Sequence, residues 1–127
     1  MAKNMNYQIV TNNPTVKNIY EEVIFVEGDF EDVLFKVRDL VHTGFELINH
    51  PLGASIRMFF SPYRSIIVRE KQEKINDVYV ETIENSIENY KKHMSVRNPD
   101  TVNSEDYALI DAELLKSALD EYERIYN

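Results

Sequence analysis

The chain has 127 residues, of which 43% are hydrophobic and 28% are charged, as in a single soluble globular domain with its own core. Its formal net charge of −8 argues against nonspecific binding to nucleic acid or to anionic membranes, since both require a basic face. The absence of cysteine excludes disulfides, a thiolate nucleophile and a Cys-ligated metal. No apolar run is long enough to span a bilayer and the first residues do not resemble a secretory signal, so we expect a cytoplasmic protein.

Strand and helix signals alternate through the first half of the chain. Residues 7–11 (YQIVT) and 23–26 (VIFV) are short apolar runs typical of strands. Between them, Asn13 is suited to cap a helix that begins at Pro14, because proline lacks only a donor that the first helical position does not use. A longer helix begins after Asp29, its predicted N-cap. The apolar residues of this helix recur on one face: Phe30, Val33, Leu34, Val37, Leu40 and Val41.

The second half begins with a third predicted strand at 45–48, followed by an irregular loop at 49–64 and a fourth strand at 65–68. Asn76 is expected to cap a long helix that ends before the Asn98-Pro99-Asp100 turn. Residues 107–110 are either a last strand or the start of a helix. Asp111 resembles the N-terminus of the final helix, whose buried face is supplied by Leu114, Leu115, Ala118, Leu119, Tyr122 and Ile125.

These elements predict a single α/β domain over residues 1–127, with three layers and helices on both faces of the sheet. Right-handed crossovers favour a small, mainly parallel sheet of four or five strands in the flavodoxin-like order 2-1-3-4. The sequence does not decide whether strand four is parallel or antiparallel to strand three, because residues 49–64 show no helical period. If residues 56–60 are extended, this part of the sheet is antiparallel and the sheet is mixed.

The candidate site is the cationic loop after the third strand. Between Leu47 and Arg69 there is no acidic residue, where the composition of the whole chain predicts about four, and there are three arginines. In a parallel sheet, ligands collect beyond the carboxyl ends of the strands, and guanidinium groups bind carboxylate or phosphate bidentately. We therefore expect a small anionic ligand or an acidic partner segment at this edge. The predicted ligand-binding residues are Asn12, Asn13, His50, Ser55, Arg57, Ser61, Tyr63 and Arg64.

Simpler interpretations accompany this hypothesis. The arginine bias is equally well explained by two buried strands with arginines that pair to nearby acids. His50 is either a general base or, more simply, a structural hydrogen-bonding residue. A metal site from His50, Glu27 and Asp29 matches no known ligand spacing, and we expect neither a metal nor another cofactor. Residues 58–60 (MFF) are either tucked under the loop or an exposed patch for a partner.

Signatures of nucleotide binding, serine hydrolysis and zinc proteolysis are absent from the sequence. Five segments instead resemble the GrdX family: TNNP at 11–14, FVEG at 25–28, KVRDL at 36–40, HPLGAS…SPYRSI at 50–66 and LIDAELLKSAL at 109–119. The loop differs from the family pattern at residues 58–60, where the family has a second proline and polar residues.

This resemblance implies an accessory role beside the glycine, sarcosine and betaine reductases of amino-acid-fermenting anaerobes, with no catalytic residues to transfer. The expected partners are reductase subunits or a small anionic ligand. Two other functions compete with this interpretation. One is a small enzyme that acts on an anionic metabolite through His50, Arg57 and Arg64. The other is a self-associating protein, a homodimer through its C-terminal helices.

Overall fold

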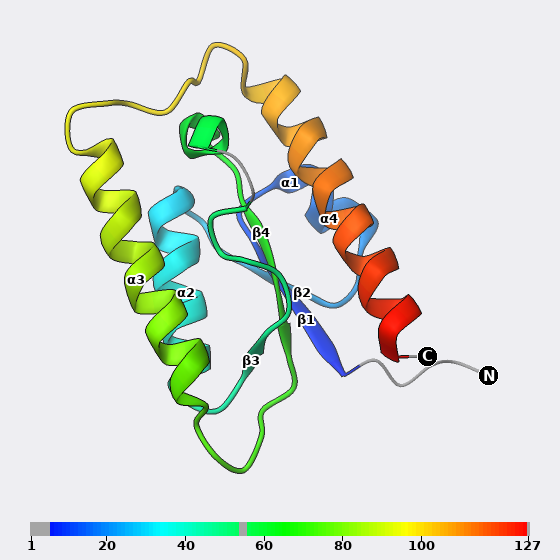
Figure 1. Ribbon diagram of the computed structural model, residues 1–127. Helices are drawn as coiled ribbons and strands as arrows, with labels where there is room; N and C mark the ends of the chain where they lie inside the picture. Colours follow the sequence, from blue (N-terminus) through cyan, green and yellow to red (C-terminus); the bar gives the residue numbers. More distant parts are fainter. Residues whose placement is uncertain (1–5, 54–55, 127) are drawn as a thin grey trace.

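A four-stranded mixed sheet lies between two pairs of helices in the computed structural model of the protein (Figure 1). The structure describes residues 6–53 and 56–126, and for residues 56, 57 and 126 it describes the backbone alone. In chain order the elements are β1 (Tyr7–Thr11), α1 (Pro14–Ile19), β2 (Val23–Phe25), α2 (Phe30–Val41), β3 (Glu46–Leu47), the 3₁₀ helix η1 (Ile56–Phe60), β4 (Ser65–Arg69), α3 (Asp77–Met94) and α4 (Ser104–Tyr126).

The α/β class is confirmed, but the predicted strand order is wrong. The strands lie in the order β2-β1-β4-β3, in which β1 is parallel to β2 and both β1 and β3 are antiparallel to β4. A parallel return from β3 would need a crossover connection, normally a helix packed on the sheet. The chain between β3 and β4 holds only the short helix η1 among its described residues. It therefore comes back antiparallel, and β4 takes the place beside β1 that the flavodoxin-like order gives to β3.

Strand β4 lies in the middle of the sheet and is covered on both faces. Its first four residues, Ser65 to Val68, are all buried. Ile66 and Val68 face the helices α2 and α3, whereas Ile67 faces α1 and α4. A strand that is buried on both faces has a continuous apolar run instead of an alternating one, which explains the SIIV sequence of this strand.

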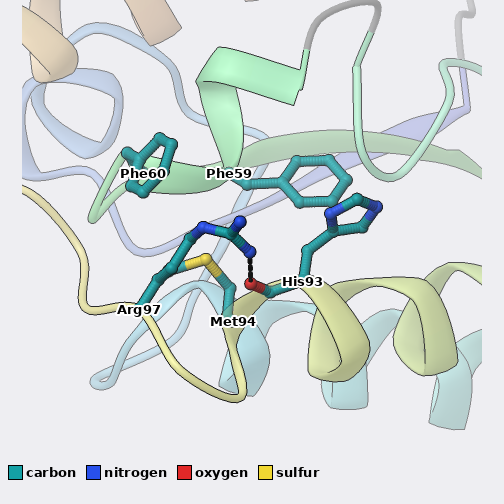
Figure 2. A pocket seen from close by; sticks show the side chains of 5 residues that line it. All are labelled: Phe59, Phe60, His93, Met94 and Arg97. Atoms are coloured by element: carbon teal, nitrogen blue, oxygen red, sulfur yellow. Dashed lines mark hydrogen bonds between the residues drawn. The ribbon is translucent and has the colours of Figure 1, made fainter.

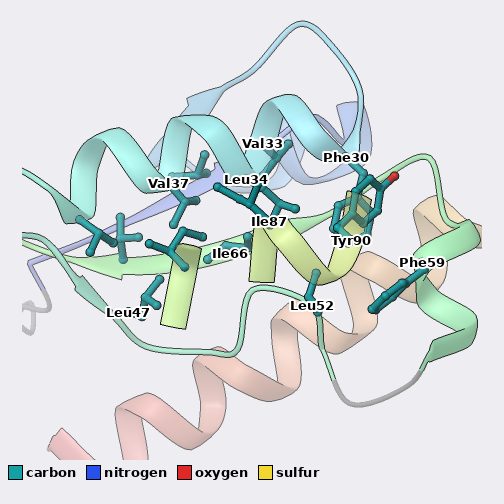
Figure 3. Close-up of a cluster of buried hydrophobic side chains, with 14 residues drawn as sticks. Phe30, Val33, Leu34, Val37, Leu47, Leu52, Phe59, Ile66, Ile87 and Tyr90 are labelled. Carbon is teal, nitrogen blue, oxygen red and sulfur yellow. The ribbon is translucent and has the colours of Figure 1, made fainter. Parts of the chain in front are cut away.

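Two hydrophobic clusters hold the layers together, one on each face of the sheet. The larger cluster joins α2 and α3 to the sheet (Figure 3), and its buried side chains include Phe30, Leu34, Val37, Ile66, Ile87 and Tyr90. The rings of Phe30 and Tyr90 stack with centroids 4.6 Å apart. The smaller cluster, on the opposite face, consists of Ile9, Val16, Ile67, Leu115 and Leu119. The expectation of helices on both faces is thus confirmed.

Three helix starts agree with the sequence and one does not. Asn13, Asp29 and Asn76 each accept a hydrogen bond from a backbone N–H of the helix that they precede, as predicted. Helix α4, however, begins at Ser104, where Glu105 and Asp106 occupy the first turn. Residues 107–110 are therefore helical and Asp111 lies inside α4, so the prediction that Asp111 caps a helix is wrong. None of the described helices is both long and apolar enough to cross a membrane.

Candidate functional site

The sheet edge formed by the end of β1 and the start of β4 gathers the segments that the sequence pointed to. Because these two strands are antiparallel, the last residue of β1, Thr11, pairs with the first residue of β4, Ser65. Hydrogen bonds then join this edge to Gly28, after β2, and to the 50–51 segment, after β3. We call Thr11, Asn12, Asn13, Arg64, Ser65 and Asp111 the edge cluster; all six are buried.

Asn12 ties three segments together through one side chain. Its Nδ2 donates to the carbonyl oxygen of Gly28 at 3.0 Å and to that of Pro62 at 2.8 Å. Its Oδ1 accepts from the backbone N–H of Arg64 at 2.9 Å. The side chain is only 5% exposed. The amide thus has its hydrogen bonds satisfied within the protein, and it fixes the end of the 49–64 loop to the turn after β2.

Arg64 holds the beginning of the same loop. Its side chain points back so that Nε donates to the carbonyl oxygen of Pro51 at 2.8 Å and Nη2 donates to that of His50. The residue is 4% exposed. Burial lowers the pKa of the Arg64 guanidinium, and the negative charge of Asp111 offsets part of this shift. Gly53 lies beside the guanidinium with a φ of +76°, a left-handed conformation that favours glycine.

Asp111 connects α4 to this edge and was not predicted to do so. Its Oδ1 accepts from the backbone N–H of Ser65 at 2.9 Å, while Oδ2 accepts from the Ser65 hydroxyl at 2.7 Å and from Asn13 Nδ2 at 3.0 Å. Thr11 Oγ1 lies 2.7 Å from the same hydroxyl. The carboxylate is fully buried. One sequence signal was available, because Asp111 lies four residues before Leu115 on the apolar face of α4.

His50 and Ser61 also take part in local turns. The Nδ1 atom of the His50 ring accepts from the backbone N–H of Leu52 at 3.1 Å, so the neutral ring carries its proton on Nε2. Partial burial and the positive charge of Arg64 lower the pKa of this imidazole. The hydroxyl of the buried Ser61 donates to the carbonyl oxygen of Tyr63 at 2.7 Å and accepts from its N–H at 3.0 Å.

The structure describes less of the remaining residues that were predicted to bind a ligand. Tyr63 is half-buried, and its backbone makes the turn with Ser61 just described. Ser55 lies outside the described residues. Arg57 belongs to η1 by its backbone, and its side chain is outside the description. Within the described part of the chain, no three His, Asp or Glu side chains are arranged to hold a metal ion.

A cavity of about 280 Å³ lies between η1 and the end of α3 (Figure 2). It is lined by Phe59, Phe60, His93, Met94 and Arg97. Phe59 is 5% exposed and meets the His93 ring edge-on, with centroids 5.1 Å apart. Phe59 is therefore buried against α3, whereas Phe60 is only half-buried. Arg97 was not predicted as a site residue because it follows α3 and lies far along the chain from Phe59 and Phe60.

A second cavity of about 240 Å³ adjoins the first and shares Met94 and Arg97 with it. Its other lining residues are Asp29, Glu31, Tyr90, Lys91 and Pro99. Burial, reinforced by the negative charges of Asp29 and Glu31, raises the pKa of the Tyr90 hydroxyl to about 12. The two cavities thus share the guanidinium of Arg97. The first cavity adds aromatic rings to it, whereas the second adds two carboxylates, the ammonium of Lys91 and the ring of Tyr90.

The fold and the edge cluster define a small α/β protein in which a loop is fixed against the edge of a mixed sheet by buried polar side chains. The sequence matches the family described as GrdX-like protein over residues 8–120. The chain therefore belongs to the GrdX-like protein family, and the resemblance seen in its motifs is confirmed. Comparisons with curated proteins and with solved structures gave no significant match.

Proposed function

We propose that this protein is a non-catalytic accessory component of the glycine, sarcosine and betaine reductase system, and that its 49–64 loop binds an anionic ligand or an acidic segment of a reductase subunit. Membership of the GrdX-like family supports the association with this system. The deficit of acidic residues between Leu47 and Arg69 supports an anionic partner, since the rest of the chain is strongly acidic and would repel one.

The observation that carries the proposal is that both ends of the loop are held by buried side chains. Arg64 fixes the beginning of the loop through the carbonyls of His50 and Pro51, and Asn12 fixes the end through Pro62 and the Arg64 N–H. A segment fixed in this way loses little conformational entropy when it binds a partner. The edge cluster is suited to holding the loop in place and not to binding the ligand itself, because its polar atoms already form hydrogen bonds within the protein.

The experiment measures binding to purified reductase subunits by interferometry and compares three forms of the protein. Replacement of Arg57 by Glu reverses a charge in the middle of the loop. Replacement of Arg124 by Glu makes the same change on α4, where the side chain is 74% exposed. We expect the wild type and the Arg124→Glu variant to bind alike and Arg57→Glu to bind at least about tenfold more weakly.

If the Arg57→Glu variant binds a subunit as tightly as the wild type does, the interface lies outside the loop. If the wild type binds none of the subunits, a small anionic ligand remains as the partner of the loop. A thermal-shift panel of anionic metabolites against the same three proteins tests this possibility. A panel without stabilisation, together with no subunit binding, would refute the proposed function.

A further inference from the structure

The cavity between η1 and the end of α3 combines apolar walls with a cationic group. Phe59 and Phe60 come from the loop of the proposed function, while His93, Met94 and Arg97 come from α3 and the turn after it. Figure 2 shows the guanidinium of Arg97 between the ring of Phe60 on one side and those of Phe59 and His93 on the other. The stem of Arg97 passes beside the Met94 thioether.

Arg97 keeps most of its hydrogen-bonding capacity. One of its amino groups, Nη1, donates to the carbonyl oxygen of His93 at 2.6 Å, and the side chain is exposed. The other N–H groups of its guanidinium have no acceptor among the residues that the structure describes. A guanidinium has five N–H donors in a planar fork that matches a carboxylate. The anchored Nη1 holds the group in the mouth of the cavity, and the remaining donors are available to a bound anion.

The adjoining cavity limits the charge that such an anion can carry. Its walls include the carboxylates of Asp29 and Glu31 together with the ammonium of Lys91, and Arg97 lines both cavities. Glu31 forms no ion pair among the described residues. A ligand with one negative group can place it on Arg97. A second negative group in the adjoining cavity would meet two carboxylates against the single ammonium of Lys91, which lies 5.3 Å from the centroid of the Phe35 ring, and would gain no net attraction there.

We infer that this cavity binds a small monocarboxylate with an apolar body, whose carboxylate contacts Arg97 and whose apolar part lies against Phe59 and Phe60. This inference rests on the proposed function for the role of the loop and gives its anionic ligand a chemical class. The cavity volume of about 280 Å³ suits a ligand of roughly ten non-hydrogen atoms. A ligand of that size binds with a Kd on the order of millimolar.

The test uses three matched probes on the ¹⁵N-labelled protein, followed by ¹H–¹⁵N spectra. Phenylacetate carries one carboxylate, 2-phenylethanol is its neutral counterpart, and phenylmalonate adds a second carboxylate to the same ring and carbon. We expect phenylacetate to shift, in a saturable way, the amide signals of residues 59, 60, 93, 94 and 97. The other two probes are expected to bind at least about fivefold more weakly.

Two variants test the contact with the carboxylate. Arg97→Gln removes the charge from an exposed position and should raise the Kd of phenylacetate roughly tenfold. Lys92→Gln removes an exposed charge from the last turn of α3, the helix that Arg97 follows. Lys92 lies outside the lining of either cavity, and its replacement should change the Kd less than about twofold.

Three results would overturn the inference: no saturable shift with phenylacetate, shifts that map outside the cavity, or equal Kd values for the wild type and Arg97→Gln. Equal binding of phenylmalonate would overturn the limit to one negative charge. The proposed function is judged separately by the binding of reductase subunits. A protein that binds a subunit through its loop but ignores phenylacetate would refute only the inference, and the reverse result would refute only the proposed association.

Discussion

Arg64, at the end of the 49–64 loop, and Arg97, which follows α3, show how differently the same side chain can be used. Arg64 is 4% exposed, and its guanidinium donates to the carbonyl oxygens of His50 and Pro51. Arg97 is exposed, and one of its amino groups donates to the carbonyl oxygen of His93 near the end of α3. The first arginine is part of the structure of the loop, whereas the second retains donors for a molecule that arrives from solvent. Burial and hydrogen-bond partners distinguish these roles, and residue type does not.

The comparison extends to the surroundings of each arginine. Around Arg64, the edge cluster pairs buried polar groups with one another, so a change in one member leaves others unsatisfied. Around Arg97, one cavity supplies aromatic rings and a thioether and the other supplies the carboxylates of Asp29 and Glu31, but among the described residues only the His93 carbonyl accepts a hydrogen bond from its guanidinium. Substitutions in the first region should therefore change stability, and substitutions in the second should change binding. The four predictions below test this division, beginning with the largest expected effect.

The largest loss of stability is expected from Asp111→Ala. This change removes a fully buried carboxylate, leaves the Ser65 N–H without its acceptor and leaves Asn13 Nδ2 with the Ala108 carbonyl as its one remaining acceptor. We expect the free energy of unfolding to fall by about 3 kcal/mol, measured by urea denaturation. Asp120→Ala is the control, because it removes an exposed carboxylate from the same helix and should change stability by less than about 0.5 kcal/mol. Equal effects of the two changes would show that the edge cluster does not stabilise the fold.

The next effect is expected from Arg64→Gln. The shorter side chain cannot reach both loop carbonyls, so the buried carbonyl of Pro51 or the partly buried carbonyl of His50 loses its donor. The expected loss is about 2 kcal/mol, with faster amide hydrogen exchange at the start of the loop. Normal stability combined with unchanged exchange would contradict the conclusion that Arg64 fixes this segment.

Local features of this structure were readable from the sequence because short-range chemistry decides them. Asn13 next to Pro14 identified one helix start, and Asp29 before the apolar stripe of α2 identified another. The three strands of the first half were also found, since each is a short apolar run between turn signals. These patterns depend on residues a few positions apart, and no tertiary contact overrides them here.

Strand order and the edge cluster depend on contacts between distant parts of the chain. The flavodoxin-like order failed because the described residues of the 49–64 segment hold only the short helix η1 and no crossover helix, and the pairing of β4 with β1 then decided the topology. Asp111 resembled a cap, yet it lies where a buried aliphatic residue would be expected in α4 and meets Ser65 on the neighbouring strand. Its position on an apolar stripe was visible, but its partners were not.

The third effect appears only at alkaline pH and concerns Tyr90, which lines the acidic cavity next to Arg97. Its pKa in the folded protein is about 12, against an ordinary value of 10. Between pH 10 and 12 the unfolded chain loses this proton while the folded protein keeps it, so rising pH favours unfolding. The stabilisation is complete below pH 10 and is lost as the pH approaches 12. Tyr90→Phe should therefore lose less stability than the wild type over this interval, measured by urea denaturation at several pH values.

The smallest change in stability is expected from Arg97→Gln, which repeats the Arg64→Gln substitution at an exposed site. The bond from Nη1 to the His93 carbonyl lies at the end of α3, where water can replace it, so the free energy of unfolding should change by less than about 0.5 kcal/mol. Urea denaturation of the two variants side by side gives the direct measure of the difference between the regions. A loss at Arg97 as large as the loss at Arg64 would show that this guanidinium also serves the fold. Its donors would then be unavailable to a carboxylate, and the distinction between a structural arginine and a binding arginine would fail at the residue that defines it.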